Sequence, residues 1–278
     1  MQSAAFILWL VFLEQPSMDH PRLGRLRIYP FKALDACEPD CIAIAPGGSL
    51  AWDRQYALQD ADGRFLNGKR SEKIHALRSS FDLEKKTITL WTAQHTEKKT
   101  FEIVSGFIEL EKYFSEFLGQ YVKIVRNEAL GFPDDSEAFG PTIISSATLE
   151  TVASWFPGVT VENVRRRFRA NLELDGVEPF WEDRLYGESG RTVAFHIGSV
   201  LFHGVNPCQR CIVPTRDPET AQRFPDFQKI FQEKRRATLP AWANPERFDH
   251  FYRLAVNTRT GAGQAGKMIH VGDAVRVD

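Results

Sequence analysis

The chain has 278 residues, with 35 Lys and Arg against 36 Asp and Glu and a hydrophobic content of 43%. This length allows one large domain or two modest ones, each with its own core. The near-zero net charge argues against a nucleic-acid partner or an acidic membrane surface, and four cysteines are too few for a disulfide scaffold. We therefore expect a globular cytoplasmic protein without stable membrane association.

An apolar stretch, Ala4–Leu13, lies near the start of the chain. It is too short to span a bilayer, which needs about 20 residues. No Lys or Arg precedes it, as the first part of a signal peptide would require. We expect residues 1–21 to form a non-functional extension, with a tail anchor or a peripheral membrane segment as the alternative.

Short alternating or β-branched segments fill most of residues 22–129. Segments of this length, separated by polar turns, are typical of a β-barrel or a β-sandwich. Apolar and aromatic residues repeat with helical spacing over residues 108–118, which predict one helix. The predicted strands are 24–31, 41–45, 54–59, 63–68, 86–92, 100–104 and 121–125.

Residues 130–142 are rich in Gly, Pro and acids and show no periodicity, which predicts a linker. Beyond it, no repeated alternation of strand and helix indicates a parallel sheet. We therefore expect a mixed α+β, β-rich protein with one domain at 22–129 and a second at 143–278. In the second domain, the sequence predicts helices at 148–155 and 218–237, the latter broken at Pro225. It predicts strands within 168–174, 192–198, 199–205, 251–256 and 268–277.

The cysteines form two close pairs, Cys37/Cys41 and Cys208/Cys211. Four thiolates could hold a structural zinc ion, but zinc does not need the Arg and Pro residues that surround the second pair. A thioredoxin-like dithiol needs a helix N-terminus in a βαβ context, which is not predicted here. Both cysteines of the second pair could also be small buried side chains. The remaining interpretation is a single thiolate bound to a redox metal, with the charge of Arg210 favouring the thiolate.

Several motifs in the second half, FRANLELDG, FWEDRLYG and IGSVLFHGVNPCQRCIVPTRDP, resemble the core of the MOSC domain, a module related to the C-terminal part of molybdenum cofactor sulfurases. Upstream, RLRIYPFKALDA and GGSLAWDRQYALQDADGRFLNGKR resemble the N-terminal β-barrel domain that accompanies it. The subgroup that they resemble most is the mitochondrial amidoxime-reducing component and its bacterial relatives. The resemblance covers about residues 24–276. It implies an N-terminal β-barrel-like domain followed by a MOSC β-barrel domain with a few peripheral helices.

The resemblance also implies a cofactor, Mo-molybdopterin, whose pterin carries a phosphate. In the family pattern the second cysteine of the motif is the molybdenum ligand and catalytic residue, which here is Cys211, whereas Cys208 is not a ligand. Cations and hydrogen-bond donors suit a phosphate and a pterin. The family usually has serine where this chain has Ala33, and Ser145 also fits a helix cap. The implied cofactor contacts are Lys32, Arg54, Ser145, Thr148, Arg169, Asn171, Gln209, Arg210 and Cys211.

The activity that the resemblance implies is reduction of N-hydroxylated compounds such as amidoximes, hydroxylamines and N-oxides. The sequence lacks the C-terminal cysteine cluster of a fused ferredoxin domain. We therefore expect electrons from a separate protein of the ferredoxin, cytochrome b5 or flavoprotein type. Two alternatives stay open: a cofactor or sulfur carrier with a persulfide on Cys211, and a non-catalytic zinc protein that uses all four cysteines.

Overall fold

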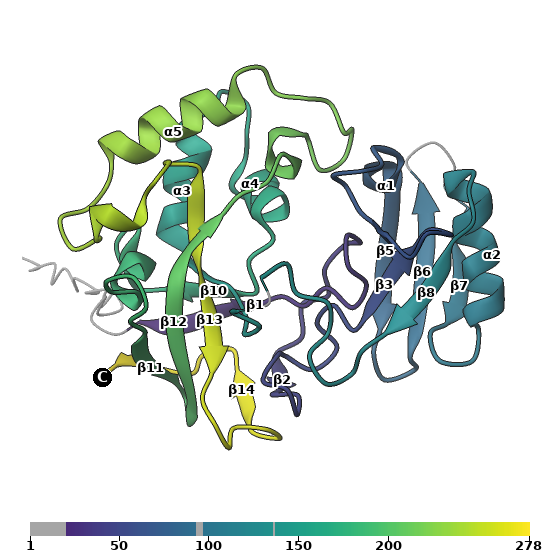
Figure 1. Ribbon diagram of the computed structural model, residues 1–278, viewed down its shortest axis with the longest axis horizontal. Coiled ribbons are helices and arrows are strands. Elements are labelled where there is room, and N and C mark those ends of the chain that lie inside the picture. The colour runs from purple at the N-terminus through teal and green to yellow at the C-terminus, as the bar shows by residue number, and fades with distance from the viewer. Residues whose placement is uncertain (1–20, 93–96, 136) are drawn as a thin grey trace, which may run out of the picture.

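The computed structural model describes residues 21–92, 97–135 and 137–278, and it confirms the predicted mixed α+β, β-rich fold (Figure 1). A larger lobe contains a seven-stranded sheet, and a smaller lobe contains two three-stranded sheets and the helix α2 (Phe107–Leu118). The predicted extension with its apolar stretch Ala4–Leu13 lies outside the described residues. Within those residues, every helix is too short or too polar to cross a membrane.

The strands and helices are mostly short, as the spacing of apolar segments predicted. The strands are β1 (Arg22–Leu26), β2 (Cys41–Ala43), β3 (Tyr56–Gln59), β4 (Phe65–Leu66), β5 (Leu77–Asp82), β6 (Thr87–Thr92), β7 (Lys99–Glu102), β8 (Lys123–Arg126), β9 (Ile143–Ser145), β10 (Leu172–Asp175), β11 (Val193–Ile197), β12 (Val200–Gln209), β13 (Arg253–Thr260), β14 (Met268–His270) and β15 (Val275–Val277). Besides α2, the α-helices are α1 (Lys73–Ala76), α3 (Ser146–Ser154), α4 (Val161–Phe168) and α5 (Phe227–Ala237). Short 3-10 helices are η1 (Trp181–Leu185), η2 (Val213–Thr215) and η3 (Pro245–Arg247).

The large sheet runs in the order β1-β10-β9-β13-β12-β11-β15. Only β9 and β10 pair in parallel among these strands. The two outer strands approach each other, because the Leu23 N–H donates to the Asp273 carbonyl at 2.8 Å and the Val275 N–H donates to the Pro21 carbonyl at 2.7 Å. The sheet is therefore a nearly closed barrel, which leaves little of its edges unpaired. Its core includes Leu26, Ile28, Ile143, Leu172, Phe195, Phe202 and Val256.

Three helices, α3, α4 and α5, pack together on the larger lobe (Figure 1). Aromatic side chains hold them: the rings of Phe156 and Phe227 stack at 4.3 Å, and the ring of Phe168 lies 5.5 Å from that of Phe231. In the smaller lobe, the sheets β4-β3-β8 and β5-β6-β7 share a core with α2. The two lobes therefore have separate cores, as two β-rich units require.

Two strands that precede the predicted linker at residues 130–142 pair with strands that follow it. β1 pairs with β10, and β2 pairs with β14, so both belong to the larger lobe. The apolar side chains of residues 22–50 accordingly lie mostly in the barrel core. Local hydrophobic patterns do not show this pairing, because β1 and its partner β10 lie far apart in the sequence.

Three local predictions need correction. Residues 168–174 were expected to be one strand, but α4 ends at Phe168 and β10 begins only at Leu172. The break expected at Pro225 is confirmed, because proline lacks the N–H that a continuing helix needs, but only the part after it is helical, from Phe227, and residues 218–224 are not. β5 and β9 were not among the predicted strands. The helices expected at 108–118 and 148–155 are confirmed to within two residues as α2 and α3.

Candidate functional site

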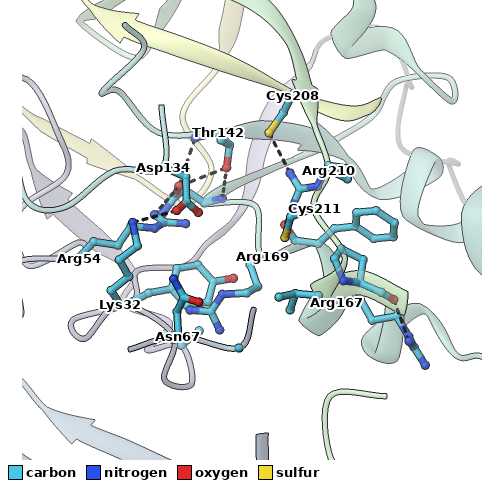
Figure 2. Close-up of a pocket in the computed structure, with 18 of the residues that line it drawn as sticks. Lys32, Arg54, Asn67, Asp134, Thr142, Arg167, Arg169, Cys208, Arg210 and Cys211 are labelled. Atoms are coloured by element: carbon cyan, nitrogen blue, oxygen red, sulfur yellow. Dashed lines mark hydrogen bonds and ion pairs between the residues drawn. The ribbon is translucent and has the colours of Figure 1, made fainter. Parts of the chain in front are cut away.

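A cavity of about 1160 Å³ is lined by residues of both lobes (Figure 2). Its walls come from the segment after β1, the turn before β3, the loop after β4, the C-terminal end of α4 and the end of β12. Residues 130–142, the predicted linker, supply a further wall through side chains that include Pro133, Asp134 and Thr142. The segment that connects the lobes is thus part of the site.

The lining is strongly cationic. Twelve of the described lining residues are Lys or Arg, and six are Asp or Glu, in a chain whose net charge is −1. A recess lined by one sign of charge concentrates ligands of the opposite sign. The cavity therefore favours an anionic ligand. The cationic residues are Arg27, Lys32, Arg54, Lys69, Arg78, Arg166, Arg167, Arg169, Arg210, Arg216, Arg247 and Arg253.

The end of β12 brings the second cysteine pair to this cavity. β12 and β13 change register between Pro207 and Gln209, where proline cannot donate to the strand ladder. The strand ends at Gln209, and Cys211 follows in the next loop, half-buried and in the lining. Cys208 also lines the cavity. The protein therefore presents two thiols to one charged space.

Arg210 contacts the sulfur of Cys208 and not that of Cys211. Its Nη1 donates to Cys208 Sγ at 3.0 Å, and its Nη2 donates to the carbonyl of Phe168. The Nε of Arg210 is buried without a hydrogen-bond partner among the described residues. Figure 2 shows the guanidinium between the two sulfur atoms. The contact of the Arg210 guanidinium with a sulfur is therefore made to Cys208.

Arg169 is the residue that departs most from an ordinary surface arginine. It follows α4 in a left-handed conformation, with φ of 55°, and its guanidinium lies 4.0 Å from the centre of the Tyr29 ring. No oxygen of the described residues pairs with this guanidinium. Burial lowers the pKa of Arg169, and the nearby charge of Arg54 lowers it further. Arg169 thus carries a positive charge that the protein itself does not neutralise.

Arg54 lies on the same aromatic ring, 5.0 Å from the centre of Tyr29. It also has a left-handed backbone, with φ of 52°, and its Nη1 pairs with Asp53 Oδ2 and with Asn171 Oδ1 at 3.3 Å. Burial opposes the charge of Arg54, but Asp53 and Asp134 raise its pKa above the ordinary value. A left-handed backbone costs free energy for a residue with a side chain, and both arginines on the Tyr29 ring adopt it.

Lys32 lines the cavity, but its ammonium group already has partners in residues 132–134. Its Nζ donates to the carbonyls of Phe132 at 2.9 Å and Pro133 at 3.3 Å, and it pairs with Asp134 Oδ1 at 2.8 Å. The next residue, Ala33, also lines the cavity. The hydroxyl that the family usually has is thus missing from the cavity wall itself.

The remaining predicted contacts divide into two groups. Asn171 and Gln209 line the cavity, although the amide of Asn171 is already bonded to Arg54, to Thr142 and to the carbonyl of Arg27. Ser145 and Thr148 do not line it. Both are fully buried.

The hydroxyls of Ser145 and Thr148 serve the larger lobe instead. Ser145 is the N-cap of α3, and its Oγ accepts from the Thr148 N–H at 3.1 Å. Thr148 Oγ1 donates to Glu182 Oε2 at 3.0 Å and accepts from the Phe180 N–H at 2.6 Å. In the structure the Ser145 hydroxyl thus caps α3, the Thr148 hydroxyl bonds Glu182 and Phe180, and neither residue lines the cavity.

Sequence reasoning missed Tyr29 and Asp134 as members of the site. Tyr29 stands three residues before Lys32 in the same motif, so the motif could have indicated that Tyr29 belongs to the site. Asp134 lies within the predicted linker, where an acidic side chain is ordinarily exposed to solvent. Only the folded chain brings it to Lys32.

The four cysteines do not come together as a zinc site. Over residues 21–92, 97–135 and 137–278, no group of three or more His, Cys, Asp and Glu could hold a metal ion by itself. Cys37 packs against the barrel core, and Cys41 lies in β2 opposite His270. Neither lines the cavity. This arrangement excludes the four-cysteine zinc alternative.

Comparison with known proteins agrees with the fold. Residues 136–276 match the MOSC domain family, and residues 20–120 match the MOSC N-terminal beta barrel domain family. The chain therefore belongs to the MOSC family, which confirms the resemblance of its motifs.

Two curated relatives are the proteins named molybdenum cofactor sulfurase from Drosophila grimshawi and Drosophila mojavensis. They are 24% identical over 237 and 235 residues, and each match covers 74% of this chain and 29% of the relative. The chain thus spans less than a third of the length of these relatives. Among solved structures, the YUAD protein from Bacillus subtilis is 11% identical, with 92% and 94% of the two chains covered and a TM-score of 0.35. A hypothetical protein is 14% identical, with 52% and 54% covered and a TM-score of 0.32.

Proposed function

We propose that this MOSC protein binds Mo-molybdopterin in the cavity and reduces N-hydroxylated compounds with electrons from a separate donor protein. The observation that carries the proposal is the presence of the Cys211 thiol and the unpaired Arg169 guanidinium in the lining of one cationic cavity. A soft thiolate suits a redox metal, and a surplus of cations suits a phosphate. The family membership and the named sulfurase relatives support a role connected with the molybdenum cofactor.

The residues present fit such a group. Cys211 would supply the protein sulfur for the metal, and Arg169, Arg54 and Lys32 would neutralise a phosphate. The orphaned Nε of Arg210 and the partnerless guanidinium of Arg169 are donors that the protein leaves unused. When bound, the group supplies a metal that exchanges two electrons with the N–O bond of the substrate.

The chain itself contributes binding and orientation. The guanidinium ions of Arg54 and Arg169 share the Tyr29 ring, which fixes their spacing before a ligand arrives. Both lobes line the space, and the charge of a partly buried side chain in it, such as Lys32 at 12% exposed, is screened less than a charge on the open surface. We further propose that the electron donor is a separate protein of the ferredoxin, cytochrome b5 or flavoprotein type.

The test is a comparison of two cysteine variants produced in a host that makes the cofactor. Loss of a residue that supports a metal ligand already costs about 10–100-fold, so loss of the ligand is expected to cost at least about 100-fold. Cys211→Ser should therefore reduce benzamidoxime at least about 100-fold more slowly than the wild type with a reduced viologen dye as electron source. Cys208→Ser, the matched control in the same cavity, should keep most of the activity.

Equal loss in both variants would contradict the single-thiolate assignment and favour a paired-thiol site. Cofactor content is measured on the same samples. It shows whether Cys211→Ser lost the metal or only its reactivity.

A second candidate function, sulfur transfer, rests on the Arg210–Cys208 contact at 3.0 Å. The guanidinium would hold the Cys208 sulfur in place to accept the outer sulfur of a donor persulfide, which leaves as a thiol. Cyanide treatment of purified protein releases thiocyanate from a persulfide. Release that is abolished by Cys208→Ser, in protein without molybdenum, would favour this function over the reductase.

A further inference from the structure

The side chain of Arg210 lies between two thiols that line one cavity. Its Nη1 donates to Cys208 Sγ at 3.0 Å, and Figure 2 shows the guanidinium between this sulfur and that of Cys211. Both cysteines are half-buried, and neither is in a disulfide. Arg210 therefore occupies the space through which the two sulfur atoms would approach each other.

The guanidinium is held in this place by contacts outside the cysteine motif. Its Nη2 donates to the carbonyl of Phe168 at the end of α4, and the group lies 5.4 Å from the centre of the Phe168 ring. The backbone N–H of Arg210 donates to the carbonyl of Tyr252, just before β13, at 3.0 Å. The position of Arg210 thus depends on the packing of the larger lobe and not on the two sulfur atoms.

Cysteines three positions apart can form a disulfide where the chain turns. The bond needs Cα atoms within about 7 Å of each other, a distance that the first and fourth residues of a turn reach. β12 ends at Gln209, and Cys211 lies in the loop that follows. A disulfide here would withdraw the Cys211 sulfur from a metal, because the form of cysteine that binds a metal is the thiolate.

The contact with Arg210 favours the two thiols over the disulfide. To bond with Cys211, the Cys208 sulfur must leave the guanidinium, so the hydrogen bond at 3.0 Å belongs to the reduced pair. A contact that exists in only one of two states shifts the equilibrium toward that state. The reduced pair is therefore stabilised by the same group that separates the sulfur atoms.

We propose that Arg210 is a positioning residue that keeps Cys208 and Cys211 apart as two free thiols, which leaves the Cys211 sulfur available to a metal. This inference rests on the proposed function only in taking Cys211 as the thiol that must stay free. A chain that binds molybdenum through Cys211 but shows no effect of Arg210 on the thiol pair would overturn the inference and leave the proposed function intact.

The experiment measures the equilibrium between the two thiols and their disulfide in the full chain, produced in a host unable to make the pterin cofactor. Mixtures of reduced and oxidised glutathione set the oxidising strength of the buffer. As the sulfur–sulfur bond forms between Cys208 and Cys211, their two protons and two electrons convert one oxidised glutathione into two glutathione thiols. Free thiols are then alkylated, and mass spectrometry of a proteolytic digest shows which cysteines are joined.

Arg210→Met should raise the equilibrium constant for the Cys208–Cys211 disulfide by about tenfold or more over the wild type, because the reduced pair loses a hydrogen bond from a charged group. Arg210→Gln removes the charged fork but keeps a polar side chain, and it should shift the constant in the same direction. Tryptophan fluorescence shows whether each variant is folded.

Arg253→Met is the matched control. Arg253 lines the same cavity, and its Nη1 donates to the carbonyl of Pro207, the neighbour of Cys208, at 3.0 Å. It donates to no sulfur of the described residues. This variant removes an equal charge close to the thiols and should leave the constant within about twofold of the wild type.

Three outcomes would overturn the proposal. Equal constants in the wild type and in Arg210→Met would show that the guanidinium does not separate the thiols. Equal increases in Arg210→Met and Arg253→Met would show a general effect of charge. If every variant forms only mixed disulfides with glutathione, the two sulfur atoms cannot meet and need no residue to keep them apart.

Discussion

Two arginines, Arg235 and Arg169, show how differently this protein uses enclosed charge. Arg235 is 1% exposed, pairs with Asp183 and lies 4.2 Å from the centre of the Phe180 ring. Arg169 lies 4.0 Å from the Tyr29 ring and has no acidic partner among the described residues. The charge of Arg235 is neutralised within the larger lobe, whereas that of Arg169 faces the cavity.

The difference separates a charge that serves the fold from one that serves a ligand. A buried pair that loses one member becomes unstable, because the other member stays in a low-dielectric interior. An unpaired cation is the opposite case, because burial already disfavours it and an incoming anion would relieve that cost. Substitutions at the two places should therefore have opposite effects on stability and on binding.

The largest effect is expected from Arg235→Met. The variant leaves the Asp183 carboxylate buried without its partner, and breaking a buried pair from one side costs about 3–5 kcal/mol. Urea denaturation followed by tryptophan fluorescence measures the free energy of unfolding. The double variant Arg235→Met/Asp183→Leu removes the stranded charge and should recover most of the loss. If the double variant is as unstable as the single one, Arg235 stabilises the fold through packing and not through its ion pair with Asp183.

The next effect is a pH dependence of stability at Glu182, which lies beside this pair and is 1% exposed. Burial, together with the charge of Asp183, raises the pKa of Glu182 from 4.5 to about 7. The folded protein therefore binds more protons than the unfolded chain between these two values. Its stabilising contribution is complete below about pH 4.5 and is lost as the pH rises through 7, by at most ~3 kcal/mol.

Urea titrations of the wild type and of Glu182→Gln at about pH 5 and pH 8 measure this contribution. The wild type should lose stability relative to the variant at the higher pH. A stability difference that does not change with pH would show that Glu182 titrates normally.

On the cavity side, Arg169→Met should lower cofactor content and leave stability unchanged or higher. A hydrogen bond to a charged group contributes about 1.5–3 kcal/mol, so pterin content should fall about tenfold or more. Arg166→Met is the control, because Arg166 lines the cavity but already pairs with Glu219. Full pterin content in Arg169→Met would place the phosphate elsewhere.

The smallest effect is expected from Ser145→Ala. Loss of an N-cap hydroxyl costs about 1 kcal/mol of stability. Because Ser145 does not line the cavity, pterin content should stay at the wild-type level. A clear loss of pterin with unchanged stability would restore the cofactor contact that the family resemblance implied for this residue.

The sequence predicted those parts of the fold that depend on local periodicity. α2 and α3 were predicted nearly to the residue, because their apolar positions repeat with helical spacing. α4 was missed because three consecutive arginines, Arg165 to Arg167, hide the apolar face formed by Val164 and Phe168. The barrel closure and the membership of β1 in it could not be predicted, since they depend on pairing between distant segments.

The sequence predicted which residues belong to the site better than it predicted the contacts between them. Motif resemblance named Lys32, Arg54, Arg169 and Cys211, and all four line one cavity. It could not show that Lys32 is already paired with Asp134, because that contact joins two segments that are 102 positions apart. The partner of each charge is a property of the folded chain, and it decides which charges remain for a ligand.

Molybdenum and pterin content test most directly whether Cys211 and the cavity cations hold the cofactor. Elemental analysis and pterin fluorescence are measured on the full chain purified from a host that makes the cofactor. We predict about one molybdenum and one pterin per chain in the wild type and in Cys208→Ser, and little or no molybdenum in Cys211→Ser. A wild-type chain free of both molybdenum and pterin, or one that holds stoichiometric zinc instead, would contradict the assignment.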